Sequence, residues 1–303
     1  MKIVKKIKSH FFNYTFIEHI ATGESYNTNV KLQRNLDKSL WVGKISRPLY
    51  LPNVNNRSES YSSTGDLLDL NDRALLGFRL ARSVGLNSLR VKIIPFKIVE
   101  EFDINTLSHA RIDNYVFLTP FKGLSLPQYL ASKSFSSLEE SDIKNKEEAI
   151  RSFIFNLWIG NYDNKDKDYL VDNDSNLISI DYHLLGPTSQ DNKNLSLGAC
   201  GEMFDIDNSE DTGWCVGNGE LLNYIKNNPN HRCFDDTINK INSISKRRIK
   251  LAMRDLHFYN QGTQQDINRL FLNFLIERQV KLKKTIKDWI KADYPIASLP
   301  KQK

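Results

Sequence analysis

Three carboxylate side chains in the middle of the chain have the types and the spacing that phosphoryl transfer uses. Asp163 and Asp168 stand five residues apart in a charged loop, and Asp181 directly follows the short apolar-alternating segment 177–180. Transfer of a phosphoryl group from ATP needs one carboxylate to orient the attacking hydroxyl and two oxygen ligands for Mg²⁺. These three residues could supply both functions if the fold brings them together.

The segments around these carboxylates favour such a gathering. The apolar run 153–159 predicts the end of a buried helix, which would stop at Gly160, and the segment 177–180 predicts a short strand. A helix end, an acidic loop, a strand and a further acid would then meet at one point. The alternative is a solvated turn, because loops rich in Asp, Asn and Lys are usually exposed.

The segment 160–168, GNYDNKDKD, together with Asp181 resembles the catalytic loop and the metal-binding acid of HipA-type kinases, and more distantly those of phosphatidylinositol 4-kinases. Those families carry N-x-D-x-x-x-x-N, followed by an acid at the end of a short strand. The resemblance implies that Asp163 is the catalytic acid/base and Asp181 the main Mg²⁺ ligand. Asp168 stands where the families have an Asn ligand, and its carboxylate is also a hard oxygen donor for Mg²⁺.

A lysine near the N-terminus is the candidate phosphate contact. In the strand predicted at 40–45, Leu40, Val42 and Lys44 share one face. A lysine on an apolar face either extends its ammonium to the surface or pairs with an anion, and the phosphates of ATP are one such anion. The resemblance implies that Lys44 contacts these phosphates. The helix predicted at 71–84 carries no Glu to pair with this lysine, which departs from the family pattern.

Two further segments join the nucleotide site through the resemblance. The turn-rich stretch 21–27 contains Gly23 and Ser25, and the resemblance implies that this turn covers the phosphates. The strand predicted at 114–118 is followed by Thr119 and, two residues later, Phe121. By the resemblance, this strand end is the hinge whose backbone receives adenine, with Thr119 and Phe121 as contacts.

The order of the predicted elements indicates an α+β fold. Strands are expected near 12–20, 29–32, 40–45, 89–94, 114–118 and 177–180, and helices near 71–84, 124–132, 144–158, 221–227, 234–243, 245–259 and 264–291. The resemblance implies a two-lobed, protein-kinase-like arrangement. Its β-rich N-lobe would span residues 1–121 and its mainly helical C-lobe residues 122–303.

Length and composition are those of a folded globular chain. The 303 residues are 40% hydrophobic and carry a net charge of +6. No apolar run approaches the ~20 residues of a membrane span, and residues 1–12 lack the apolar stretch of a signal peptide. The cysteines, Cys200, Cys215 and Cys233, form no C-x-x-C pair and leave one thiol unpaired in any disulfide scheme. We therefore expect free thiols and a reducing compartment.

Three functions fit these features. The resemblance implies a serine/threonine protein kinase that acts as a bacterial toxin or effector, in the bacterial cytoplasm or delivered into a host cell, with an antitoxin or acidic protein as a partner. The alternatives are a lipid or small-molecule kinase and a catalytically impaired pseudokinase scaffold. The basic residues of 245–259 and 264–291 could dock an acidic partner or an anionic lipid surface, or be solvated faces. Direct nucleic-acid binding is not expected.

Overall fold

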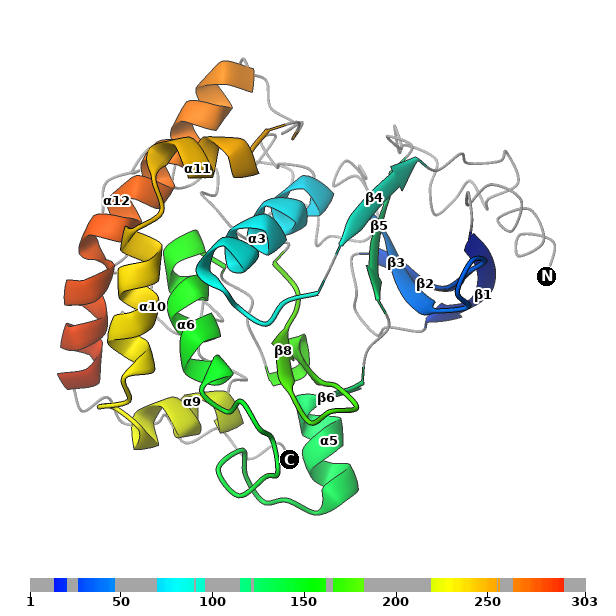
Figure 1. Cartoon of the computed structure of the whole chain (residues 1–303), viewed down its shortest axis with the longest axis horizontal. Coiled ribbons are helices and arrows are strands. Elements are labelled where there is room, and N and C mark those ends of the chain that lie inside the picture. The colour runs from blue at the N-terminus through cyan, green and yellow to red at the C-terminus, as the bar shows by residue number, and fades with distance from the viewer. Residues whose placement is uncertain are drawn as a thin grey trace, which may run out of the picture.

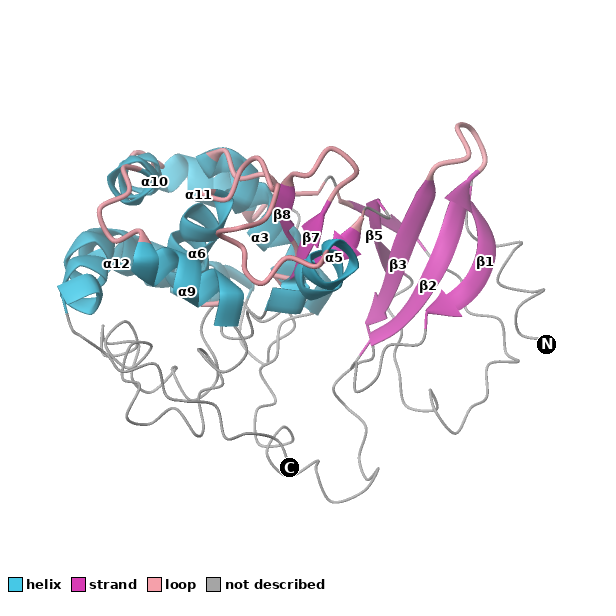
Figure 2. Ribbon diagram, turned by 90° about the horizontal axis from the view of Figure 1, so that it is seen from below, coloured by secondary structure: helices cyan, strands magenta, loops and turns pink. Residues whose placement is uncertain are grey.

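The computed structural model of the chain describes residues 14–20, 27–46, 70–89, 91–95, 115–120, 123–161, 166–182, 219–254, 256 and 264–291. Within these residues the chain forms two antiparallel sheets and seven α-helices, which confirms the α+β class. The larger sheet lies at one side of the molecule and the helices gather at the other, with the smaller sheet between them (Figure 1, Figure 2). None of the helices described here combines the length and the apolar character that a membrane span requires.

The larger sheet is built from the strands that side-chain alternation predicts in the first part of the chain. Its five strands are β1 (Tyr14–Ile20), β2 (Asn27–Arg34), β3 (Leu40–Ser46), β4 (Lys92–Pro95) and β5 (Tyr115–Pro120). They pair in the order β1-β2-β3-β5-β4, so that β3 is central. Trp41 of β3 packs edge-on against Tyr14, with ring centroids 5.9 Å apart, and the Lys92 ammonium lies 5.1 Å from its ring centroid. These contacts join three strands of the sheet.

The smaller sheet has three short strands, β6 (Leu124–Ser125), β7 (Tyr169–Val171) and β8 (Leu177–Ser179), in the order β6-β7-β8. Oδ1 of Asp172 closes the β7–β8 turn by accepting the N–H groups of Asp174 (3.0 Å) and Asn176 (2.9 Å). Gly123 has a φ of +58° and lies so close to β7 that a Cβ there would be 1.7 Å from the Val171 carbonyl oxygen. A glycine is therefore required where the chain crosses from the larger sheet onto this hairpin.

The helices share one core, and α6 lies at its centre. They are α3 (Leu70–Val84), α5 (Leu126–Lys133), α6 (Glu148–Ile159), α9 (Gly219–Asn227), α10 (Cys233–Asn242), α11 (Lys246–Ala252) and α12 (Gln264–Lys291). All residues of α6 except Arg151 are buried. The helix lies between α10 and α12 on one side and β8 on the other (Figure 1, Figure 2). Trp158 Nε1 donates to the carbonyl of Leu275 (2.9 Å), and Arg278 Nη2 donates to that of Leu157 (2.6 Å).

The amphipathic pattern of α12 predicted which of its residues face this core. Its side chains Phe271, Phe274, Leu275, Leu282 and Ile286 are all buried. Their spacing of three, four and seven residues places them on one stripe of the helix. The length of α12 is also the predicted one, Gln264–Lys291.

The helix predicted at 144–158 begins four residues late, at Glu148. The cause is the neighbouring hairpin. Asn145 accepts the N–H of Leu177 at 2.6 Å and donates to its carbonyl at 3.0 Å, and the N–H of Lys144 donates to the carbonyl of Ser175 at 2.9 Å. Because residues 144 and 145 bond to the hairpin, the helical conformation starts only after them.

The helix predicted at 245–259 is shortened by a tertiary contact. α11 ends at Ala252 instead of continuing to 259, because Arg79 Nη1 of α3 donates to the carbonyls of Ala252 (2.8 Å) and Arg254 (2.7 Å). In a longer helix, backbone N–H groups of the next turn would donate to these carbonyls.

The strand predicted at 89–94 is β4, Lys92–Pro95. β7 is absent from the sequence prediction, although Tyr169-Leu170-Val171 is a β-favouring run before a turn.

Candidate functional site

The site is built from the C-terminal end of α6. Gly160 has a φ of +65°, and its N–H donates to the carbonyl of Leu157 at 3.3 Å. The N–H of Asn161 donates to the carbonyl of Asn156 at 3.0 Å. This is the bonding of a Schellman motif, which favours glycine at the left-handed position. The motif fixes Asn161, which is 1% exposed, at the start of the acidic loop.

Asp168 and Asp181, two of the predicted metal ligands, flank the open end of the β7–β8 hairpin. Tyr169 pairs with Ser179, and the N–H of Ile180 donates to the carbonyl of Asp168 at 2.9 Å. The ladder thus extends one step beyond the strands and brings Asp168 next to the backbone that leads into Asp181. Asp168 is buried and Asp181 is half-buried. The structure therefore places the backbone of Asp168 beside the segment that leads into Asp181.

The side chain of Asn161 connects the α6 end to this hairpin end. Its Nδ2 donates to Asn156 Oδ1 at 3.2 Å and to the carbonyl of Asp181 at 3.1 Å. The Asp181 backbone has a φ of +71°, in the left-handed region that few residues other than glycine adopt. In the sequence, Asn161 is recognisable only as part of the loop motif. Its contact with Asp181 depends on tertiary structure, and no local sequence pattern predicts it.

Asp166 is a second polar residue whose role the sequence does not reveal. Its carboxylate accepts the N–H groups of Glu220 (3.1 Å) and Leu221 (3.3 Å) at the start of α9. Burial raises the pKa of Asp166 to about 6, against the lowering effect of these two hydrogen bonds. An acid at a helix N-terminus is a common cap, but here the cap comes from more than fifty residues away. The acidic loop is thereby fixed to α9.

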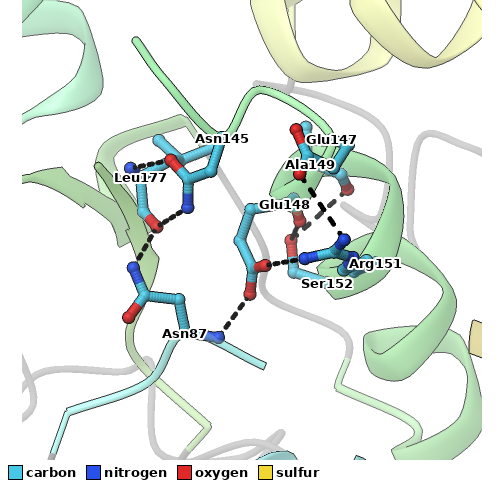
Figure 3. Close-up of polar contacts among 8 residues, drawn as sticks. All are labelled: Asn87, Asn145, Glu147, Glu148, Ala149, Arg151, Ser152 and Leu177. Carbon is cyan, nitrogen blue, oxygen red and sulfur yellow. Dashed lines mark hydrogen bonds and ion pairs between the residues drawn. The ribbon is translucent and has the colours of Figure 1, made fainter. Parts of the chain in front are cut away.

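The start of β8 is fixed by a separate polar network (Figure 3). The carbonyl of Leu177 accepts Nδ2 of Asn87 at 2.8 Å and Nδ2 of Asn145 at 3.0 Å. The Glu148 carboxylate accepts the backbone N–H of Asn87 at 2.7 Å and lies 3.5 Å from Nη1 of Arg151. Burial raises the pKa of Glu148 to about 7, although both of these neighbours act to lower it. The network ties the hairpin to the connection between α3 and β4.

Lys44 and Thr119, two of the predicted nucleotide contacts, lie on neighbouring strands of the larger sheet. Lys44 of β3 pairs with Phe117 of β5, and Val42 pairs with Thr119. Positions two apart on a strand share a face, so residues 44 and 119 lie on the same face of the sheet. Thr119 is buried. Thr119 precedes Gly123 by four residues, so these two residues lie at most about 14 Å apart.

The other predicted site residues lie outside the described residues. These are the catalytic candidate Asp163 and the nucleotide candidates Gly23, Ser25 and Phe121. Asp163 falls between Asn161 and Asp166 in the sequence, and both of these are placed. Across the described ranges, no three His, Cys, Asp or Glu side chains gather as a metal site. Of the predicted catalytic and metal-binding carboxylate residues, the structure describes Asp168 and Asp181. Asn161 bonds to the carbonyl of Asp181.

No protein-family model matches the sequence, and no curated protein is similar to it at a significant level.

Proposed function

We propose that this chain is an ATP-dependent phosphotransferase, with a serine/threonine protein kinase of HipA type as its most specific form. The observation that carries the proposal is the position of Asp168 and Asp181 at one end of the hairpin, which the Asn161 side chain joins to the end of α6. A buried helix end, an acidic loop and a hairpin are the arrangement that the loop motif requires. The helix end, the loop and the hairpin all consist of residues that belong to this motif or lie next to it in the sequence.

The donors at this end of the hairpin fit a hard divalent cation. Carboxylate oxygens are among the ligands that Mg²⁺ prefers, and Asp168 and Asp181 carry such oxygens. Oδ1 of Asn161 is buried and has no hydrogen-bond partner within the described part of the chain. In this proposal Asp168 and Asp181 hold Mg²⁺, and the Mg²⁺–ATP complex, when bound, supplies the phosphoryl group and neutralises its charge.

The chain's own residues would contribute position and proton transfer. Asp163 would orient the acceptor hydroxyl and accept its proton, which for a positioned carboxylate is worth about 10²–10⁴-fold in rate. Lys44 would bind phosphate from the central strand of the sheet, and residues 119–121 would receive adenine. In the two-lobed form of the proposal, the N-lobe is residues 1–121 and the C-lobe is residues 122–303. α3 belongs to the N-lobe by sequence but packs against α10 and α11 of the C-lobe. The crossing at Gly123 would then join the two lobes.

A pseudokinase is the second candidate, and one observation favours it. α3 contains no Glu, and its Arg79 is bonded to the carbonyls of Ala252 and Arg254 at the end of α11. In the families resembled, a helix Glu pairs with the strand lysine. Without that pair, nucleotide could bind without efficient transfer. A lipid or small-molecule acceptor is a further form of the kinase proposal, and the choice of acceptor in the experiment separates it from the protein kinase.

The test is phosphoryl transfer from radiolabelled ATP to proteins of a cell lysate and to a lipid panel, alongside thermal shifts with ATP in the presence and absence of Mg²⁺. Wild-type protein should be stabilised by Mg²⁺–ATP and transfer label, and Asp163→Ala should bind nucleotide but lose transfer. Asp174→Ala is the matched control, because this exposed acid lies in the hairpin turn at the opposite end from Asp181. Stabilisation without transfer supports the pseudokinase. No stabilisation by nucleotide contradicts both candidates.

A further inference from the structure

The backbone of Asp181 is fixed on both sides by its neighbours. Before it, the N–H of Ile180 donates to Asp168. After it, Tyr182 is fully buried, and its ring packs edge-on against Phe78 and Phe155, with centroids 4.8 and 5.5 Å apart. Between these two anchors Asp181 adopts a φ of +71°. A residue other than glycine stays in this region only where the surrounding structure determines its conformation.

Asn161 donates a side-chain hydrogen bond to the carbonyl of Asp181, at 3.1 Å. The orientation of the Asn161 amide is fixed by chemistry. Both groups near its nitrogen, Asn156 Oδ1 and the Asp181 carbonyl, are acceptors, so the NH₂ must face them. The amide keeps this orientation although its own Oδ1 is left buried without a partner among the described residues. A buried unsatisfied oxygen is unfavourable and calls for a compensating role.

We infer that Asn161 is a positioning residue, whose amide holds the Asp181 carbonyl and thereby directs the Asp181 carboxylate toward a divalent cation shared with Asp168. The inference rests on the proposed function, because it assigns Asn161 a part in the cation site of that function. Asn161 suits this part since the Schellman motif of α6 fixes its backbone. Its position therefore does not depend on the cation. A residue that supports a ligand in this way typically changes metal affinity by about 10–100-fold when it is removed.

A purely structural role would give a different result, and the chain offers a matched control. Asn87 also donates from Nδ2 to a carbonyl of the same hairpin, that of Leu177, at 2.8 Å. Leu177 starts β8, whereas Asp181 lies beyond its end. Removal of either amide deletes one hydrogen bond to the hairpin. Only removal of the Asn161 amide should change the cation site.

The experiment measures Mn²⁺ affinity by electron paramagnetic resonance, with a non-hydrolysable ATP analogue present and absent. Asn161→Ala and the more space-filling Asn161→Leu should weaken Mn²⁺ binding by about 10-fold or more, whereas Asn87→Ala should lower the melting temperature but leave Mn²⁺ affinity unchanged. Circular dichroism at the measuring temperature selects the Asn161 variant that is folded. Equal Mn²⁺ affinity in wild type and that variant overturns the inference and leaves the proposed function intact.

A double-mutant cycle gives the decisive comparison. Asp181→Asn keeps a residue type that tolerates positive φ and removes the charge of the ligand. If Asn161 acts through Asp181, Asn161→Leu has no further effect on Mn²⁺ affinity in the Asp181→Asn background. Additive losses overturn the inference. If wild-type protein binds no Mn²⁺ with or without nucleotide, the proposed function and the inference fail together.

Discussion

Glu148 and Asn87 lie 61 residues apart in the sequence, yet the Glu148 carboxylate accepts the backbone N–H of Asn87 at 2.7 Å (Figure 3). Glu148 is the first residue of α6, and Asn87 lies in the connection between α3 and β4. The bond therefore joins the central helix to the segment that leads into the larger sheet. Because this carboxylate is buried, its charge state should influence the stability of the whole junction.

Protein stability should fall as the pH rises through the range in which Glu148 ionises. Burial raises the pKa of Glu148 from 4.5 to about 7, so between these values the folded chain holds a proton that the unfolded chain releases. The free energy of unfolding then decreases with rising pH in this window and levels off above about 7. The shift corresponds to a loss of about 3 kcal/mol. Urea unfolding from pH 4.5 to 8 measures it.

Glu148→Gln isolates this contribution, since an amide can still accept the N–H of Asn87 but does not titrate. The variant should show a flatter pH dependence than wild type. Glu147→Gln, one position earlier and more exposed, is the control and should leave the fall with pH in place. The same slope in wild type and Glu148→Gln would contradict the prediction.

Asp166→Ala should destabilise the protein by about 1–2 kcal/mol, because it leaves the N–H groups of Glu220 and Leu221 without the carboxylate that now accepts them. Asp166→Asn retains an acceptor and should lose less. Denaturant unfolding followed by circular dichroism gives both values. Equal losses for the two variants would mean that the charge, and not the hydrogen bonds, stabilises the start of α9.

Gly123→Ala should destabilise the protein by at least about 2–3 kcal/mol, because the new methyl group would overlap the Val171 carbonyl and the backbone has positive φ. Gly219→Ala is the matched control. Among the described residues, a Cβ there meets only Asp166 Oδ2, at 3.9 Å, and the change should be nearly neutral. Midpoints of urea unfolding compare the two. A tolerated Gly123→Ala would show that β7 can move away from this crossing.

Asp168→Asn converts the loop to the residue type of the families it resembles, and under the proposed function it should preserve phosphoryl transfer. One carboxylate fewer at the cation site should raise the Mg²⁺ concentration needed for half-maximal nucleotide binding by about 10-fold, because the cation loses a charged ligand. A titration of Mg²⁺ at fixed ATP measures this. Asp174→Asn should leave the titration unchanged. A Mg²⁺ requirement that Asp168→Asn does not alter would remove Asp168 from the site.

Local patterns were sufficient to predict most of the fold. The 3.6-residue period of α12 and the apolar run of α6 placed both helices, and the turn after Val171 contained the signal for the hairpin. The boundaries that differ are those set by contacts between distant segments. Asn145 delays the start of α6, and Arg79 bonds to the carbonyl of Ala252 at the end of α11.

The candidate site divides in the same way. Spacing along the chain predicts a metal site that includes Asp168 and Asp181, and this site stays a prediction. The structure shows the backbones of both residues at one end of the hairpin. The contributions of Asn161 and Asp166 depend on partners twenty and more than fifty residues away. No propensity or period carries that information, since a side-chain hydrogen bond of this kind is selected only after the elements have packed.

The enclosure of α6 has a consequence for hydrogen exchange. A helix covered on all sides should exchange its amides only through global unfolding, whereas β1, at the edge of the larger sheet, should exchange through local opening. Deuterium uptake measured peptide by peptide should therefore show two well-separated opening free energies. Asn161 directly follows α6 and bonds to the carbonyl of Asp181, so the hairpin end should open together with this helix. The edge of the larger sheet should then open and close many times while the acidic end of the hairpin stays assembled.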